Sequence, residues 1–335
     1  MAVAIVLPAA FGLPAALGLP RAMLSASDPA RSHPSSRAAS PLPGSLLIAD
    51  KRNNRLLVVG RLHRVKWEFP HGGDLPRGQL FLIPDDAFYT PHRHTILATE
   101  EDYNVIREID VRSRHIIWQY GHPGIPGSST GYLSGPDDAY RLSNGLTTVA
   151  DIRNCRILFI DSKERVVRQY GRPGDCRHDP PRAFAAPNGD TPGPGGGMLV
   201  TEIGGSWIDF LSKTGRLVWA FQSPLQYPSD AQLLPNGHIL VCDYTFPGRV
   251  VEFDTHSHIV GSFGSSSGPN LLNHPSLAIR LPNGLTALND DWNHRVIIVD
   301  MRSGRIVWQY GVTGVAGDSH GYLNNPDGID FNPKH

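Results

Sequence analysis

Short apolar stretches recur along this chain, separated by turns rich in Gly, Pro and Asn. Six of these stretches end in an acidic residue, and a second apolar stretch follows each one after a loop. The acids return roughly every 40 to 51 residues, at Asp50, Glu100, Asp151, Glu202, Asp243 and Asp290. A period of this length indicates an array of similar small sheets. Because the acid recurs in every unit, we expect it to mark a strand end and to serve the fold rather than a catalytic ring.

Each unit follows one pattern of strands and turns. The third unit shows it best, with a Pro-led strand at 136–144, apolar strands at 145–151 and 156–161, and a strand near an aromatic residue at 165–171. Asn-Gly pairs at 144–145, 188–189, 236–237 and 283–284 separate two strand-like runs, which is a strong hairpin signal. Runs such as 56–59, 157–160 and 296–299 are continuously apolar, as strands covered on both faces are. The pattern predicts four strands in each unit and sheets packed face to face.

The order of the strands predicts how the array closes. The first unit begins with its second strand at 45–50, while the chain ends with an unpaired first strand at 326–331. Pairing these two segments closes a ring and removes an exposed sheet edge. We therefore predict an all-β fold, a six-bladed β-propeller of four-stranded blades over residues 44–335, with residues 328–333 innermost in the blade made by 45–69.

These motifs resemble known propeller repeats. A Pro before the inner strand, an Asn-Gly turn, a strand ending in Asp and then Asn-x-Arg (53–55 and 293–295) are similar to NHL repeats, which form six-bladed propellers. The endings at 303–311 and 214–221 are also similar to quinoprotein-like repeats, although the vicinal cysteines and eight blades of that class are missing. The resemblance implies the fold; propellers of this kind include scaffolds, RNA binders, lyases and lactonases.

Composition and charge exclude some partners. Thirty-one basic residues balance thirty-one acidic ones, so no overall field attracts nucleic acid or an acidic membrane. One basic run is an exception, and we interpret it as a solvated surface: Lys51, Arg52, Arg55, Arg61, Arg64 and Lys66. RNA binding through this run is a third and weaker hypothesis.

The first 43 residues differ from the rest of the chain. Residues 2–20 are apolar but are interrupted by three prolines, so we expect no stable membrane span. The segment resembles a secretory signal, with Ser25 and Ser27 before a possible cleavage point, and residues 28–43 resemble a disordered linker. We expect export, with a mistaken start codon or a disordered leader as the alternative. Cys155 and Cys176 would be able to pair in an oxidising compartment, but we expect two free thiols.

Functional residues are sought where equivalent positions differ between units. Two residues after the leading Pro of each inner strand, Asp86, Asp138 and Asp230 are expected to converge on one mouth of the channel, together with Arg182. His274 precedes its Pro and is expected to be a base or an additional ligand. Tyr132 and Tyr322 lie in two similar long loops and are expected to contact a ligand. The carboxylates would hold a hard divalent cation, pair with Arg182 to bind a polar ligand, or cap their own turns.

The sequence contains no HExxH helix, phosphate loop or dinucleotide fingerprint, so no nucleotide or quinone site is evident. Two functions stay open. The first is a non-catalytic propeller that binds a protein, a glycan or a small molecule at the channel mouth. The second is a metal-assisted hydrolase or lyase at the same mouth, with His274 and Arg182 as catalytic residues.

Overall fold

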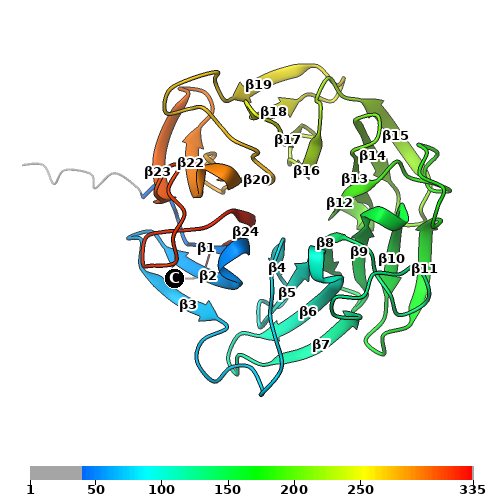
Figure 1. Ribbon diagram of the computed structural model, residues 1–335. Helices are drawn as coiled ribbons and strands as arrows, with labels where there is room; N and C mark the ends of the chain where they lie inside the picture. Colours follow the sequence, from blue (N-terminus) through cyan, green and yellow to red (C-terminus); the bar gives the residue numbers. More distant parts are fainter. Residues whose placement is uncertain (1–39, 334–335) are drawn as a thin grey trace, which may run out of the picture. The chain divides into compact units, whose positions relative to one another are not determined.

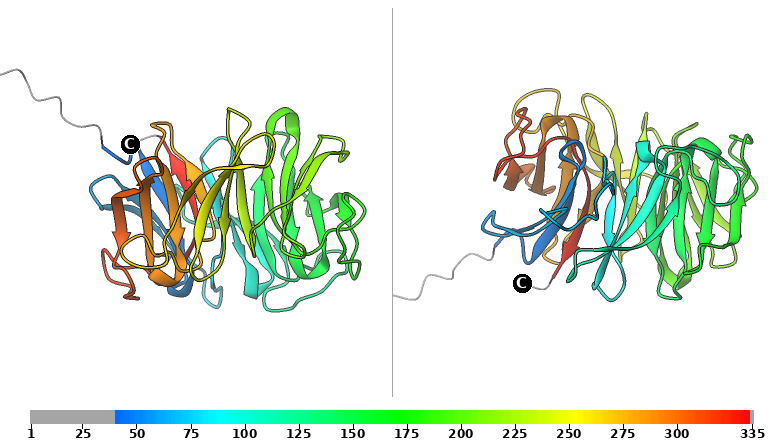
Figure 2. Two further views of the ribbon diagram at one scale, coloured as in Figure 1. Left: turned by 90° about the horizontal axis from the view of Figure 1, so that it is seen from above. Right: turned by 60° about the horizontal axis from the view of Figure 1, so that its bottom comes forward.

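The computed structural model describes residues 40–333, which form a ring of six four-stranded antiparallel sheets (Figure 1). We number the sheets as blades 1 to 6 along the chain. In side view the strands run between two faces that carry the loops (Figure 2). The prediction of a six-bladed propeller is confirmed. The expected leader covers residues 1–43, and its first 39 residues lie outside the described residues.

The strands of blades 1 to 3 are given from the innermost outward. Blade 1 contains β24 (Pro326–Asn332), β1 (Ser45–Asp50), β2 (Arg55–Gly60) and β3 (Val65–Phe69). Blade 2 contains β4 (Ala87–Tyr89), β5 (Thr95–Glu100), β6 (Val105–Asp110) and β7 (Ile116–Gly121). Blade 3 contains β8 (Pro136–Arg141), β9 (Thr147–Asp151), β10 (Arg156–Ile160) and β11 (Val166–Gly171).

Blades 4 to 6 repeat this order. Blade 4 contains β12 (Pro187–Pro192), β13 (Met198–Glu202), β14 (Trp207–Leu211) and β15 (Leu217–Gln222). Blade 5 contains β16 (Pro228–Leu233), β17 (Ile239–Asp243), β18 (Arg249–Phe253) and β19 (Ile259–Phe263). Blade 6 contains β20 (Ala278–Arg280), β21 (Thr286–Asp290), β22 (Arg295–Asp300) and β23 (Arg305–Gly311).

Short 3₁₀ helices are the other regular elements of the described chain: η1 (Lys51–Asn53), η2 (Glu101–Tyr103), η3 (Ile152–Asn154), η4 (Pro194–Gly196) and η5 (Asp291–Asn293). None of the described helices has the length and apolar character needed to cross a membrane.

The ring closes through β24, the last strand of the chain. It pairs antiparallel with β1, with Ser45 opposite Asn332 and Ile48 opposite Ile329. This confirms the predicted pairing of the two ends of the propeller. Because β1 has β24 on one side and β2 on the other, its backbone hydrogen-bonding groups are covered on both edges.

Apolar side chains pack between neighbouring blades, as the continuous apolar runs predict. Leu47 and Leu56 of blade 1, for example, share a cluster with Ile96 and Ala98 of blade 2. The indole of Trp67 also donates a hydrogen bond across this interface to the carbonyl of Val111 (2.9 Å). Burial on both faces therefore fixes the position of each sheet in the ring.

The acid that ends the second strand of each blade anchors the loop that leads into the inner strand. We call this residue the sixfold acid: Asp50, Glu100, Asp151, Glu202, Asp243 and Asp290. In blade 3, one oxygen of Asp151 accepts the backbone N–H of Ser134 (2.7 Å) and the other accepts Arg156 Nε (2.7 Å). Blades 1, 2, 5 and 6 have the same arrangement, with Arg55, Arg107, Arg249 and Arg295. In blade 4, Glu202 accepts the N–H of Ala185, and no arginine contact to it is present among the described residues. The acids thus hold the loops of the channel mouth in place.

Two local expectations are wrong. Asn188-Gly189 is not a turn, because it lies inside β12; the turn before β13 uses Gly195 and Gly196, both at positive φ. Cys155 and Cys176 form a disulfide rather than two free thiols, with Cα atoms 5.2 Å apart. The bond ties the loop after β11 to the start of β10.

The basic run of blade 1 does not form one surface. Lys51 is mostly buried and pairs with acids, and Arg55 pairs with Asp50. Arg52 lies over the Trp292 ring, 4.9 Å from its centroid. Only the remaining three residues are free of these contacts and exposed: Arg61, Arg64 and Lys66. The six basic residues are therefore not one solvated surface, because Lys51 and Arg55 are paired with acids.

Candidate metal and ligand site at the channel mouth

The inner strands begin with a turn that aims consecutive side chains at the channel. The residue before the leading Pro has a left-handed backbone in five blades, for example Ile83 (φ 51°) and Asn325 (φ 55°). In blades 3, 4 and 5 the two residues after the Pro oppose a single residue of the second strand, which is a β-bulge. Bulges re-aim side chains, and here they present two successive residues of one strand to the mouth.

Two rings of residues result from this arrangement. The outer ring, directly after the Pro, consists of Asp85, Asp137, Asn188, Ser229, Ser276 and Asp327. The inner ring, one residue further on, consists of Asp86, Asp138, Gly189, Asp230, Leu277 and Gly328. All three predicted carboxylates therefore belong to one ring, and each is buried.

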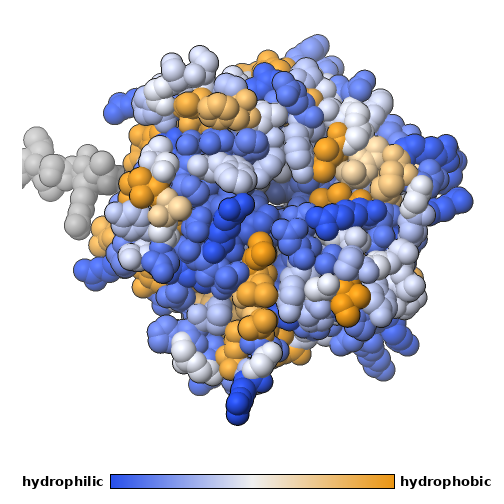
Figure 3. Space-filling view, viewed as in Figure 1, coloured by the Kyte–Doolittle hydropathy of each residue, from blue (hydrophilic) through white to orange (hydrophobic). Residues whose placement is uncertain are grey.

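A cavity of about 140 Å³ opens at this mouth. Its lining residues are Lys51, Asp85, Asp86, Glu101, Asp137, Asn188, Tyr227, Ser229, Asp230, Tyr244, Ser276 and Asp327. In the space-filling view from the same side, hydrophilic residues make up most of the rim of a central hollow, and a stripe of hydrophobic residues reaches it from below (Figure 3). The cavity is thus mainly polar, with six carboxylates in its wall and a seventh, Asp138, beside them.

Lys51 is the one cationic side chain in this wall. Its ammonium group contacts Asp85, and it lies 2.9 Å from Asp327 Oδ2 and 3.7 Å from Glu101 Oε2. One lysine leaves most of the negative charge uncompensated. Buried carboxylates in this situation either take up protons or bind cations.

The inner-ring acids form the tightest group. Oxygen atoms of Asp86, Asp138 and Asp230 lie within 4.8 Å of one another. Oδ1 of Asp86 and Oδ1 of Asp138 are buried and have no hydrogen-bond partner among the described residues. A Cβ on Gly189 would lie 3.2 Å from Asp230 Oδ1 and 3.3 Å from Asp138 Oδ2, and one on Gly328 would clash with Asp86. The two glycines therefore make room for the carboxylates.

A second group of three acids lies beside the first. Asp85, Asp86 and Asp137 also bring one oxygen each within 4.8 Å of one another. Both groups offer only oxygen ligands, which is the donor set preferred by Ca²⁺ and Mg²⁺. The unpartnered oxygens and the space left by the glycines fit such a cation.

Burial raises the pKa of these carboxyl groups well above the ordinary value. For Asp86 and Asp138 the larger cause is desolvation, and the smaller cause is repulsion from neighbouring acids. The same two causes act on the pKa of Asp137 and of Asp230. Burial and the nearby Asp85 raise the pKa of Asp327 to about 7, although Lys51 opposes the shift. A bound cation would reverse these shifts because it favours the charged form.

Arg182 does not belong to the rings. The leading Pro of blade 4 is Pro187, so Gly189 rather than Arg182 occupies the position equivalent to the three acids. Arg182 lies in the preceding loop, where its exposed guanidinium pairs with Asp179 (Nε–Oδ2 3.0 Å). Pro180, two residues before Arg182, is therefore not the start of an inner strand, and the prediction that Arg182 lies at the mouth is wrong.

His274 lies next to the cavity but does not line it. Its ring packs edge-on against Tyr244, with centroids 4.9 Å apart, and its Nδ1 is 2.8 Å from Asn273 Oδ1. Partial burial lowers the pKa of His274 below its ordinary value. The imidazole is therefore neutral near pH 7.

Tyr132 and Tyr322 are also absent from the cavity wall. Each packs against a glycine of its own long loop, Gly127 and Gly317 respectively. The ring of Tyr132 is also 4.0 Å from that of His122. These contacts give the two tyrosines a role inside their loops.

Several wall residues were missed in the sequence. Asp85, Asp137 and Asp327 follow the leading Pro directly, and Lys51, Glu101 and Tyr244 directly follow a sixfold acid. Comparing these two positions between units would have identified them. Further along the inner strands, Phe88 stacks on Tyr140 (ring centroids 4.3 Å apart) in an apolar cluster that also contains Ile279 and Ile329.

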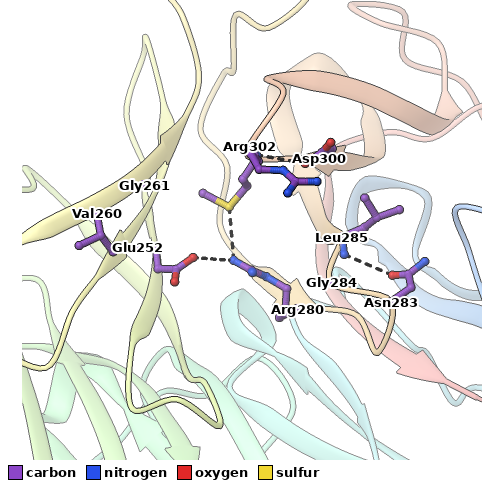
Figure 4. A pocket seen from close by; sticks show the side chains of 10 residues that line it. Glu252, Val260, Gly261, Arg280, Asn283, Gly284, Leu285, Asp300 and Arg302 are labelled. Atoms are coloured by element: carbon purple, nitrogen blue, oxygen red, sulfur yellow. Dashed lines mark hydrogen bonds and ion pairs between the residues drawn. The ribbon is translucent and has the colours of Figure 1, made fainter.

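A larger cavity of about 450 Å³ lies on the other face, between blades 5 and 6 (Figure 4). Arg280 and Arg302 are part of its wall, and Arg280 Nη2 donates to Glu252 Oε2 (2.7 Å). Because this arginine is already paired, the cavity offers less uncompensated charge than the channel mouth. We therefore regard the mouth as the stronger candidate site.

Solved structures with the same architecture support the fold. A protein of unknown function from Bacteroides caccae has a TM-score of 0.58 at 17% identity, over 85% of this chain and 98% of that one. A chain of the nidogen/laminin complex also has a TM-score of 0.58 at 13% identity, over 85% of this chain and 97% of that one. A streptogramin B lyase has a TM-score of 0.54 at 16% identity, over 86% of this chain and 87% of that one.

No protein-family model and no curated protein sequence matches this chain. The structural similarities, at these low identities, establish the fold alone. The chain is a six-bladed β-propeller of four-stranded blades.

Proposed function

We propose that the protein is a ligand-binding propeller that holds a divalent cation at the channel mouth through Asp86, Asp138 and Asp230. The observation that carries this proposal is the excess of buried carboxylates over the single Lys51. A dication removes the repulsion between the acids and satisfies the orphan oxygens at the same time. The outer ring would then face the bound ligand.

The ligand is proposed to be a small, oxygen-rich molecule such as a sugar or a polar metabolite. A cavity of about 140 Å³ admits only part of a larger molecule, so a glycan or a protein would insert one group. Tyr227 and Tyr244 supply flat surfaces, and Lys51 supplies a cation for an anionic group. The protein-bound propeller of the nidogen/laminin complex supports binding by this fold in general.

Calorimetric titration of EDTA-treated protein with Ca²⁺ and with Mg²⁺ tests the proposal. We expect one dominant site, weakened at least tenfold in Asp138→Asn and in Asp230→Asn, since each replaces a charged ligand by a neutral amide. Asp102→Asn is the control, because its side chain is 54% exposed outside the cavity wall. Absence of heat with both ions, or equal affinity in all variants, would refute the site.

A second candidate is a hydrolase or lyase acting at the same mouth. It is favoured by the neutral His274 beside the wall residue Tyr244, since a neutral imidazole near a polar cavity is able to act as a general base. The streptogramin B lyase with the same fold supports this candidate. Assays with lactones, esters and uronic-type substrates test it. Turnover abolished by His274→Ala but retained in Tyr132→Phe would favour catalysis, and no turnover would leave binding as the function.

We also propose that the protein is exported. The Cys155–Cys176 disulfide supports an oxidising compartment, because such bonds are rare where glutathione keeps thiols reduced. Fractionation of native cells, with thiol labelling before and after reduction, tests this. A cytoplasmic protein with three labelled thiols before reduction would contradict it.

A further inference from the structure

Blade 4 departs from the other blades at its sixfold acid. In blade 2, Arg107 Nη1 donates to Glu100 Oε1 (2.7 Å). Arg107 lies opposite Ala98 on the neighbouring strand. The equivalent residue in blade 4 is Asp209, opposite Val200. An acid thus stands where blade 2 has the arginine, and two carboxylates face each other.

Both carboxylates are fully buried. Glu202 and Asp209 have side chains with 0% exposure. The backbone N–H of Ala185 donates to Glu202 Oε2, which leaves Oε1 directed at the cluster. Neither oxygen of Asp209 has a hydrogen-bond partner among the described residues. Two adjacent buried acids of this kind require a proton or a cation between them.

A histidine completes the group. His178 Nδ1 is 2.8 Å from Glu202 Oε1 and 3.8 Å from Asp209 Oδ2. Its ring is stacked on Trp207, with centroids 3.8 Å apart and planes 3° from parallel, which fixes the direction of Nδ1. The preceding Cys176 is tied to blade 3 by the disulfide, so the loop that carries His178 is held at both sides.

We propose that His178, Glu202 and Asp209 bind a divalent transition-metal ion, for which Zn²⁺ is the probe. One imidazole nitrogen and two carboxylate oxygens are ligands that Zn²⁺ accepts. Ligands of a tetrahedral zinc are roughly 3.3 Å apart for bonds of about 2.0 Å, and the two distances from His178 Nδ1 lie on either side of that value. Three protein ligands leave a fourth position, and the side chain of His178 is 21% exposed to solvent. In blade 4 the ion would occupy the place that the Arg107 guanidinium has in blade 2, and it would hold the loop that carries His178 against blade 4.

The experiment uses a variant without the channel acids, Asp138→Asn with Asp230→Asn, so that its outcome is independent of the mouth. Zinc content after dialysis and competition with a chromophoric chelator give stoichiometry and affinity. We expect one Zn²⁺ per chain, at least tenfold weaker binding in His178→Ala and Asp209→Asn, and a rise in Tm of several degrees at saturating Zn²⁺.

Two further variants separate metal binding from folding. Asp209→Arg restores the pair seen in blade 2, so we expect a folded protein without bound Zn²⁺ and without a Zn²⁺-dependent shift in Tm. His238→Ala is the matched control, because His238 also contacts a glutamate (Nδ1–Glu252 Oε1 2.7 Å) but that glutamate pairs with Arg280. Zinc binding should be unchanged in it. Absence of zinc binding would show that the two carboxylates share a proton instead. Equal binding in Asp209→Arg would show that the zinc binds elsewhere, and either result would overturn the proposal.

Discussion

Lys51 shows at the scale of one residue how the channel mouth balances charge. Its ammonium group contacts Asp85 and Asp327, and its side chain is only 15% exposed. We expect Lys51→Met to lower the free energy of unfolding by about 3 kcal/mol at pH 7.5 without metal, because it leaves buried charges unpaired. Urea unfolding monitored by tryptophan fluorescence measures the change.

Measuring Lys51→Met at a second pH separates the effect of its charge from that of its packing. At pH 5 the loss should be smaller, since burial raises the pKa of Asp327 to about 7 and the carboxyl is then protonated in both variants. Lys66→Met, at an exposed position of the same blade, should leave the midpoint unchanged. An equal loss at both pH values would mean that Lys51 acts through packing of its aliphatic chain.

At the scale of the element, each blade contains a unit made of the sixfold acid, the arginine that pairs with it and the loop that the acid anchors. Arg156 is 5% exposed, and it donates to Asp151 and to the carbonyls of Ser128 (2.9 Å) and Tyr132 (3.1 Å). We expect Arg156→Met to cost about 3 to 5 kcal/mol, because three acceptors lose their donor in a buried place. Arg165→Met removes an exposed pair with Asp161 and should not shift the midpoint measurably. Equal midpoints for both variants would contradict this role of the anchor.

Strands and repeats were predictable because both faces of each sheet are buried, and burial leaves a pattern in the sequence. The wrong assignments arose where a local signal had two interpretations. Pro180 and Pro187 both fit the start of an inner strand, and only the pairing of Pro187 with Glu202 selects the second. Lys51 belongs to a charged run that normally lies on a surface, yet the ring folds its amine over the acids. The trio Asp86, Asp138 and Asp230 was found because its members occupy one position in different units.

Ring closure belongs to the scale of the whole molecule. A chain ending at Asn325 would lack β24, expose the edge of β1 and open the apolar cluster that contains Ile329. We expect this variant to self-associate on size exclusion and to unfold without a sharp transition, since an unpaired inner edge pairs with other chains. A synthetic peptide of residues 326–335 should restore the monomer. A monomeric variant with an unchanged Tm would show that blade 1 holds with three strands.

The acidic channel also determines how the stability of the whole molecule depends on pH. Burial raises the pKa of Asp86, Asp138 and Asp230 above the value of the unfolded chain, so the folded state binds more protons than the unfolded state above about pH 4. The free energy of unfolding therefore falls as pH rises, by about 1.4 kcal/mol per pH unit for each proton released.

We expect this fall between pH 5 and pH 7 in metal-free protein, since the pKa of Asp327 is raised to about 7. Half-buried acids such as Asp161 and Asp254, whose pKa is lowered by hydrogen bonds, act in the opposite direction below about pH 4 and stay outside this range. Saturating Ca²⁺ should flatten the dependence, because a bound cation makes the charged carboxylates the stable form. Urea unfolding at four pH values, with and without Ca²⁺, measures both curves. Parallel curves would show that the acids take up protons and not the cation.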